Sequence, residues 1–220
     1  MAAGVTSVLV VDDDPLVRSA LALMLGGNDA LTVVGEASDG AAGLAASREL
    51  QPDVVLMDIR MPVMDGIDAT RTLKESEKSP HVIVLTTFDV DEHVLSALEA
   101  GADGFLLKDT PPAEIVAAIQ AVADGEPMLS PSATRAVLSR IRESSPDGRG
   151  DQARRALATL TDRERDVALE VGRGLSNAEI ANRLHLSVPT VKAHVSRLFD
   201  KLQVTNRVQI AIVVHDAGLI

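Results

Sequence analysis

The chain has 220 residues, no cysteine and a formal net charge of −11. The lack of cysteine excludes disulfides, thiolate nucleophiles and cysteine-based metal sites, so any chemistry must use oxygen and nitrogen groups. No apolar run approaches the ~20 residues needed to cross a bilayer, and no basic stretch followed by an apolar one opens the chain. We therefore expect a cytoplasmic protein with no membrane partner, and a length of this size predicts two domains.

The charge is divided unevenly along the chain. Residues 1–145 contain 10 basic and 23 acidic residues, whereas residues 146–220 contain 11 basic and 9 acidic ones. A strongly acidic surface disfavours nucleic acid, because DNA binding depends on Lys and Arg side chains that meet phosphates. The acidity therefore argues against DNA binding only for the first part, and the second part remains free to approach DNA.

Short apolar segments alternate with stretches of helical spacing up to about residue 125. The apolar segments are rich in Val, Ile and Leu and do not alternate in polarity, which indicates strands buried on both faces. The predicted strands cover residues 7–11, 31–35, 53–57, 81–86 and 103–108. The predicted helices cover residues 15–25, 39–50, 65–75, 91–101 and 112–124. Five strands, each followed by a helix, predict an α/β domain at 1–125, with a doubly wound five-stranded parallel sheet as the favoured arrangement.

The remainder of the chain is predicted to be a linker and a helical domain. A helix is expected at 130–143, within a linker that covers 126–152. The last part of this linker, ESSPDGRGDQ, is dense in Ser, Pro, Gly and charge, which is typical of a flexible segment. From residue 153 the pattern is helical, with breaks at GRGLS, HLS and QVTN. These breaks predict a small all-α domain of four short helices at 153–220.

Acidic residues follow two of the predicted strands. Asp12, Asp13 and Asp14 come directly after the first strand, and Asp58 comes directly after the third. Because the carboxyl ends of parallel strands meet at one edge, where open α/β folds bind ligands, these carboxylates should converge. Packed carboxylates repel one another, and a hard cation such as Mg²⁺ relieves that repulsion.

Two further polar residues end predicted strands at the same edge. Lys108, at the end of the fifth strand, would reach the same pocket and could pair with a phosphoryl oxygen, and Thr86, ending the fourth, could supply a hydroxyl donor. Each residue alone has an ordinary role, since Asp after a strand usually caps a helix or forms a turn. Residues from four strand ends that meet at one edge favour a common site instead.

The segments VLVVDDDPLVR, DVVLMDIRMPVMDG, VIVLTTFD and GADGFLLKD closely resemble the receiver domains of bacterial two-component systems. The resemblance covers about residues 1–125 and implies a flavodoxin-like fold. It implies that Asp58 is the phosphoacceptor and that Asp13, Asp58 and the backbone carbonyl of Arg60 hold Mg²⁺. Asp12 is then a supporting acid.

The same resemblance implies how the site would work. Lys108 would hold the phosphoryl group received from a sensor histidine kinase, and Thr86 and Phe105 would be a switch pair. In this family the residues two after the acceptor and two after the switch threonine influence hydrolysis of the acyl phosphate. Here these are Arg60 and Phe88, neither of which is suited to positioning a water. Slow self-dephosphorylation is therefore expected.

The segment LTDRERDVALEVGRGLSNAEIANRLHLSVPTVKAHVSRLFDKLQVTNRVQIAI closely resembles the LuxR-type helix-turn-helix of NarL/FixJ-class regulators, over residues 157–216. Ser176 and Ser187 are placed to cap the helices on either side of the HLS turn, with Pro189 in the first turn of the second. The predicted core positions of this second helix are Val191, Val195, Leu198 and Leu202. The resemblance predicts DNA contacts from its other face: Lys192, Ala193 and Ser196 at base edges, with Thr190, His194 and Lys201 near the backbone.

The last predicted helix carries more apolar residues than a small domain needs to bury. Val208, Ile212 and Val213 either belong to the core or form a dimer seam, and the sequence leaves both open. Together the two resemblances imply a response regulator that binds double-stranded DNA and forms a homodimer when phosphorylated. Its two copies would meet half-sites about one helical turn apart.

Two other classes of protein are less well supported. A Mg²⁺-dependent phosphatase or phosphotransferase also places a nucleophilic Asp after a parallel strand, but many such enzymes have a second acid two residues later, where this chain has Arg60. A regulator rather than an enzyme is therefore expected. A receiver-like module that never takes phosphate is disfavoured by the full set of acids with Thr86 and Lys108. Phosphorylation either uncovers the recognition helix or dimerises the receivers, and both routes stay open.

Overall fold

The computed structural model describes residues 5–76, 79–87, 91–126, 128–129 and 149–220. The chain divides into two compact units, of which the first contains the residues up to Asp124 and the second contains residues 149–220. The helix predicted at 130–143 and most of the predicted linker lie outside the described residues.

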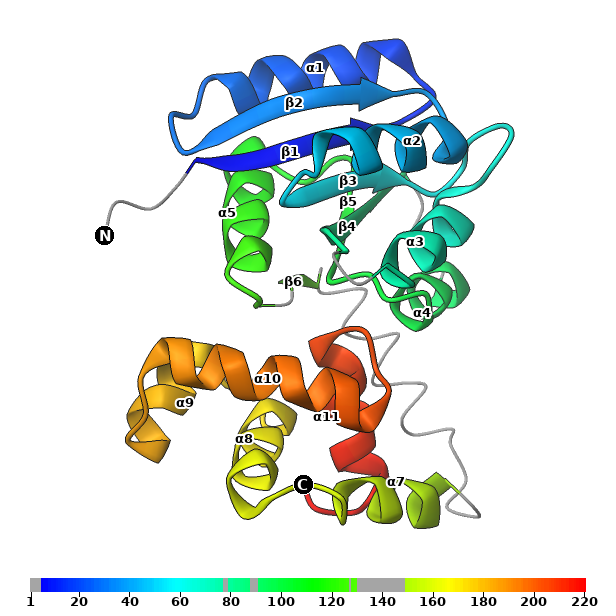
Figure 1. Ribbon diagram of the computed structural model, residues 1–220. Coiled ribbons are helices and arrows are strands. Elements are labelled where there is room, and N and C mark those ends of the chain that lie inside the picture. Colours follow the sequence, from blue (N-terminus) through cyan, green and yellow to red (C-terminus); the bar gives the residue numbers. More distant parts are fainter. Residues whose placement is uncertain (1–4, 77–78, 88–90, 127, 130–148) are drawn as a thin grey trace. The chain divides into compact units, whose positions relative to one another are not determined.

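The first unit is built on a parallel sheet (Figure 1). Its strands are β1 Thr6–Val11, β2 Leu31–Ala37, β3 Val54–Asp58, β4 His81–Thr86, β5 Gly104–Leu107 and β6 Met128–Leu129. The order β2-β1-β3-β4-β5-β6 and the parallel pairing confirm the doubly wound arrangement of the five predicted strands. The sequence did not predict β6, because a two-residue strand leaves no hydrophobic period to recognise.

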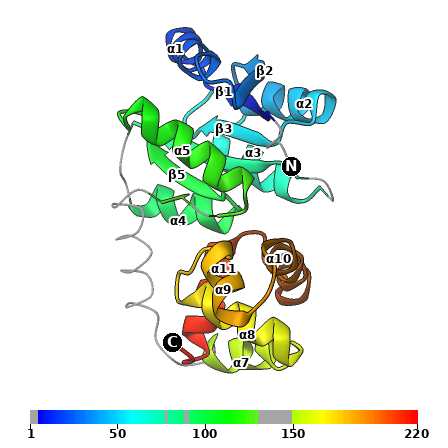
Figure 2. The ribbon, with the colours of Figure 1, turned by 90° about the vertical axis from the view of Figure 1, so that its left-hand side faces the viewer.

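Helices cover both faces of this sheet (Figure 2). They are α1 Pro15–Gly26, α2 Gly40–Leu50, α3 Gly66–Lys74, α4 Asp91–Glu99 and α5 Pro112–Ala123. The apolar sides of α1 and α5 pack with Val8, Val10 and Leu56 into one core cluster, while α2 and α3 lie on the other face. Local signals mark both ends of α5: Pro112 opens the helix, and Gly125, with a φ of 79°, follows its end.

Strand register brings the polar strand ends together. Val11 of β1 lies beside Met57 of β3, so the residues that follow them, Asp12 and Asp58, are neighbours. Thr86 of β4 is paired with Leu107 of β5, directly before Lys108. All four side chains therefore start from the same edge of the sheet, as the sequence predicted.

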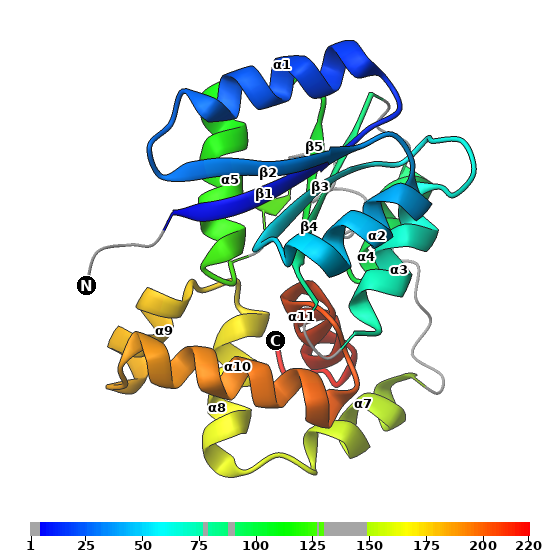
Figure 3. The same ribbon diagram turned by 45° about the horizontal axis from the view of Figure 1, so that its top comes forward.

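The second unit is helical (Figure 3). Its helices are α7 Arg149–Leu157, α8 Asp162–Gly172, α9 Asn177–Leu184, α10 Val188–Leu202 and α11 Arg207–Asp216. The four predicted helices correspond to α8–α11, but the first predicted stretch also contains α7, which begins at Arg149 inside the predicted linker. Thr161 divides the stretch, because its side chain and that of Glu164 form a capping box that starts α8. Leu157 and Ala153 anchor α7 in the domain core.

The helix-turn-helix segment follows the sequence prediction closely. The Ser176 and Ser187 side chains cap α9 and α10, and His185 takes a left-handed conformation, with a φ of 55°, at the end of α9. Val191, Val195, Leu198 and Leu202 are all buried. The apolar face of α10 therefore forms part of the core, and its other side faces away from that core.

Candidate functional site

Three carboxylates converge at the carboxyl edge of the sheet. Oxygens of Asp12, Asp13 and Asp58 lie within 4.8 Å of one another. The Asp12 and Asp58 residues are buried, whereas Asp13 is exposed. Asp14 does not join them, because its carboxylate accepts a hydrogen bond from the Leu16 N–H at 2.8 Å and caps α1. The expectation that all three consecutive acids converge is thus wrong for Asp14, which has the ordinary capping role.

Lys108 lies directly on these acids. Its Nζ is 2.6 Å from Asp12 Oδ2 and 3.1 Å from Asp58 Oδ2. Burial alone would lower the pKa of Lys108, but the hydrogen bonds and charges of Asp12 and Asp58 outweigh it and raise the pKa above its usual value. The Lys108 backbone N–H also donates to the Thr86 carbonyl oxygen at 2.8 Å. A fixed ammonium group therefore stands beside the predicted acceptor.

The negative charge of the Asp58 carboxylate is destabilised by its surroundings. Burial raises the pKa of Asp58 above its usual value, and the charge of Asp12 adds to this rise, although Lys108 works in the opposite direction. A second cation near the three carboxylates would relieve the remaining repulsion. A donor set made only of carboxylate oxygens suits Mg²⁺, so the residues present fit that ion.

The predicted switch residues lie on neighbouring strands. Thr86 ends β4 and is 3% exposed, and Phe105, in β5 opposite Val84, has no exposed surface. Arg60 is exposed two residues after Asp58, and Phe88 lies outside the described residues. The structure thus brings Thr86 and Lys108 to the acidic edge and places the Phe105 ring inside the domain.

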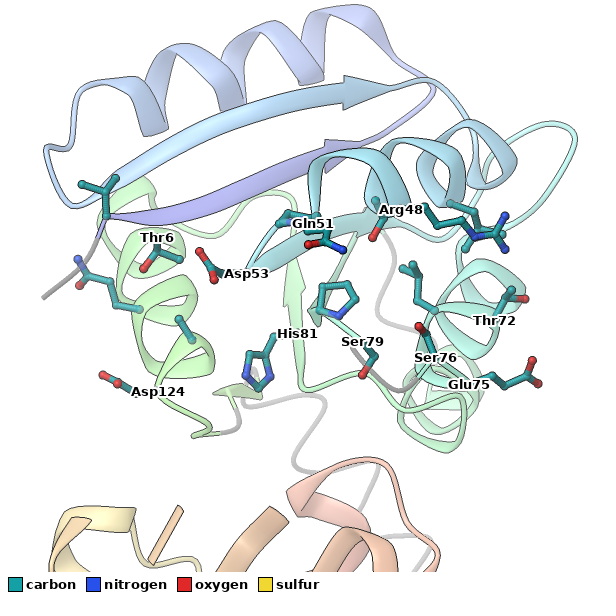
Figure 4. A pocket seen from close by; sticks show the side chains of 18 of the residues that line it. Thr6, Arg48, Gln51, Asp53, Thr72, Glu75, Ser76, Ser79, His81 and Asp124 are labelled. Carbon is teal, nitrogen blue, oxygen red and sulfur yellow. The ribbon is translucent and has the colours of Figure 1, made fainter. Parts of the chain in front are cut away.

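A pocket also lies at the opposite, amino-terminal edge of the sheet (Figure 4). Thr6 and His81, which begin β1 and β4, and Asp53, which precedes β3, are among its lining residues. The Asp53 carboxylate accepts hydrogen bonds from the Ser7 N–H at 2.8 Å and the Ser7 hydroxyl at 2.6 Å. This carboxylate therefore fastens two strands, at the end of the sheet away from Asp58.

The predicted DNA-contacting residues lie on α10. Ala193 and Ser196 are exposed, and Lys192 and His194 are partly exposed. Near the start of the helix, the hydroxyl oxygens of Thr190 and the capping Ser187 are 2.7 Å apart. These residues lie on the side of α10 that does not form the core, where Val188 in the first turn is also exposed.

Lys201, the sixth predicted contact, is bound within the domain. Its Nζ is 2.7 Å from Glu164 Oε2, and Glu164 also accepts hydrogen bonds from the N–H and hydroxyl of Thr161. The hydrogen bond from Lys201 is the main cause of a fall in the pKa of Glu164 to about 2. The ion pair joins the start of α8 to the last turn of α10, a role that the sequence analysis missed.

Acid is therefore expected to weaken the helical domain. The pKa of Glu164 is depressed in the fold, so its stabilisation is complete above the ordinary value of 4.5 and is lost as the pH falls towards about 2. Glu164→Gln should cost about 1–3 kcal/mol at neutral pH, with the difference from wild type shrinking over this window. Thermal unfolding measured at several pH values checks this, with Glu179→Gln as the control for the loss of a capping-box acid alone, because the pKa of Glu179 is lowered by its bonds to Ser176 and not by a lysine. Equal pH profiles for Glu164→Gln and wild type would contradict it.

Comparison with known proteins identifies both units. The model of the response regulator receiver domain matches residues 8–120, and the model of the bacterial regulatory proteins of the luxR family matches residues 158–214. The chain belongs to the response regulators. As a response regulator with a receiver domain and a LuxR-type DNA-binding domain, it is a two-component transcription regulator.

Full-length relatives support this membership. The transcriptional regulatory protein LiaR of Bacillus subtilis is 39% identical over 97% of this chain and 98% of its own. The nitrate/nitrite response regulator NarL of Escherichia coli K12 is 35% identical over 95% of this chain and 94% of its own. The crystal structure of ChrA, the response regulator of a heme-sensing two-component system, is 35% identical and covers 99% of this chain and all of its own, with a TM-score of 0.53. Among the described residues of our response regulator, no helix is long and apolar enough to span a membrane.

Proposed function

We propose that Asp58 accepts a phosphoryl group from a sensor histidine kinase with the help of Mg²⁺, and that this switches dimerisation and DNA binding. The observation that carries the proposal is the position of Lys108, whose ammonium lies 3.1 Å from Asp58 in a cluster of three acids. Asp13, Asp58 and the backbone carbonyl of Arg60 would hold the metal ion, with Asp12 in support. When bound, Mg²⁺ would supply positive charge to the phosphoryl oxygens.

The chemistry is a single exchange of bonds. A carboxylate oxygen of Asp58 attacks the phosphorus of a phosphohistidine, the phosphorus–nitrogen bond breaks, and an acyl phosphate forms while the histidine nitrogen leaves. Lys108 neutralises charge on the phosphoryl oxygens and separates them from the Asp12 carboxylate. Because Lys108 is already fixed by two acids, little reorganisation is needed at the moment of transfer.

The new phosphoryl group would act on the fourth and fifth strands. Its oxygens would draw in the Thr86 hydroxyl, and the Phe105 ring would repack beside it, which changes the surface around both strands. Phosphorylated receivers would then pair, and the two helical domains would bind DNA as a homodimer, with Lys192, Ala193 and Ser196 at base edges. On α11, Val208 is buried and Val213 packs against the domain core, so Ile212 is the candidate that is left for a seam.

Two lysine variants test phosphoryl uptake and DNA binding separately. Lys108→Ala should slow phosphoryl uptake from acetyl phosphate and Mg²⁺ by about 100-fold, the usual loss for one preorganised charge-stabilising group. Lys192→Ala should leave uptake unchanged and weaken specific DNA binding by about 1–3 kcal/mol. Uptake is measured by mass spectrometry of the intact chain, and DNA binding by fluorescence anisotropy. Normal uptake by Lys108→Ala would contradict the assigned site.

The acyl phosphate should be long-lived. Arg60 has no carboxylate or amide that could position an attacking water, and Phe88 is apolar. Without that help, self-dephosphorylation is expected to take many minutes to roughly hours. The decay of phosphorylated protein, separated from donor and kinase, measures this directly. Loss of the phosphoryl group within seconds would show that another group positions the water.

A further inference from the structure

An arginine on α1 holds the loop that carries two of the acids. Arg18 Nη1 donates to the Asp12 carbonyl oxygen at 2.7 Å and to the Asp13 carbonyl oxygen at 3.2 Å. Its Nε lies 3.4 Å from Glu36 Oε2 on β2, and the Arg18 side chain is only 18% exposed. One planar guanidinium therefore bonds two successive carbonyls and is itself held by a carboxylate of the neighbouring strand.

This contact holds the backbone of Asp13, the least fixed carboxylate of the acidic cluster. Asp12 is buried and is fixed by Lys108 and by the Asp14 N–H, which donates to its Oδ1 at 3.0 Å. Asp13 is exposed, so the direction of its carboxylate depends mainly on how firmly its backbone is held. Arg18 holds that backbone through the carbonyl oxygens of Asp12 and Asp13. Groups behind the ligands commonly set how strongly a metal is bound.

We propose that Arg18, supported by Glu36, is a positioning residue for Mg²⁺ at Asp12, Asp13 and Asp58. The inference rests on the function proposed above, because it concerns the same metal site. Positive charge near a cation site by itself opposes binding of the cation, so loss of the charge alone would tighten Mg²⁺ binding. Loss of positioning would weaken it. The direction of the change therefore separates the two effects.

Isothermal titration of Mg²⁺ into the full-length chain tests this. Arg18→Met should weaken Mg²⁺ binding by about 10-fold relative to wild type, as removal of groups behind metal ligands generally does. Arg48→Met is the matched control, because Arg48 is an exposed arginine at the far end of α2 and its loss removes the same charge from the same unit. The control should bind Mg²⁺ as wild type does.

A second variant is needed in case Arg18→Met does not fold, which circular dichroism would reveal. Glu36→Gln keeps Arg18 but removes the carboxylate that holds it. It should weaken Mg²⁺ binding less than Arg18→Met but more than Glu49→Gln, which removes the same charge from the exposed far end of α2. Binding by Arg18→Met as tight as that of Arg48→Met, or tighter, would overturn the inference while leaving the proposed function intact. If Arg18→Met does not fold, binding by Glu36→Gln no weaker than that of Glu49→Gln overturns it. Wild-type protein that binds no Mg²⁺ would overturn the proposed metal site itself.

Discussion

Asp58→Asn is expected to abolish phosphoryl uptake while leaving the protein folded. The amide keeps the shape of the side chain but has no anionic oxygen to attack phosphorus. Because burial raises the pKa of Asp58 in the fold, its ionised form costs folding stability at neutral pH, and the neutral amide should raise the melting temperature. Mass spectrometry after incubation with acetyl phosphate and Mg²⁺ measures uptake, and thermal unfolding measures stability.

Asp53→Asn is the matched control for this substitution. Asp53 precedes the same strand, at the opposite edge of the sheet, and binds Ser7 rather than the acidic cluster. It should keep full phosphoryl uptake and lose some stability, because its hydrogen bonds with Ser7 are weakened. Stoichiometric phosphorylation of Asp58→Asn would show that another residue is the acceptor.

Gly66→Ala is expected to be among the most destabilising substitutions in the receiver domain. A Cβ at this first residue of α3 would lie 1.8 Å from the backbone oxygen of Asp58 and 2.8 Å from its carbonyl carbon. The Gly66 N–H also donates to the Ile59 carbonyl oxygen at 2.9 Å. The start of α3 therefore cannot move away from the end of β3 without losing this hydrogen bond. We expect a loss of about 3 kcal/mol or more in the free energy of unfolding, together with impaired phosphoryl uptake.

Gly26→Ala provides the same chemical change where there is room for it. Gly26 ends α1, and beyond its chain neighbours and the helix's own backbone no atom lies within 4 Å of the position its Cβ would take. Alanine favours a helix over glycine, so a gain of roughly 0.5–1 kcal/mol is expected. Urea unfolding of both variants makes the comparison. A Gly66→Ala protein as stable as wild type would mean that Gly66 does not lie against the backbone oxygen of Asp58.

The parts of the site that the sequence predicts share one property. Each is fixed by its place along a regular element: Asp58 ends a buried strand, Ser176 and Ser187 precede helices, and Val195 recurs on a helical period. Parallel strands then carry such residues to one edge without further information. This is why the acidic cluster and the core face of α10 could be predicted from the sequence.

The parts that the sequence does not predict depend on contacts between side chains far apart in the chain. The Asp14 cap is an exception, because it is local: Asp14 directly precedes Pro15 at the start of α1, which is a readable capping signal, whereas Asp13 faces the acids. Lys201 belongs by position to the recognition helix, yet its ammonium is paired with Glu164 on α8. The start of α8, by contrast, could have been predicted, because Thr161 with Glu164 three residues later matches the capping-box pattern.

The most direct test of the proposed function is binding of the full-length protein to a pool of genomic DNA fragments. It is made with and without Mg²⁺ and beryllofluoride, which imitates a phosphoryl group on Asp58, for the wild type and for Asp58→Ala. We predict that specific fragments are enriched more strongly with the mimic and that this gain disappears in Asp58→Ala. Equal enrichment with and without the mimic would contradict control by Asp58, and no enrichment in either condition would contradict the proposed DNA-binding face.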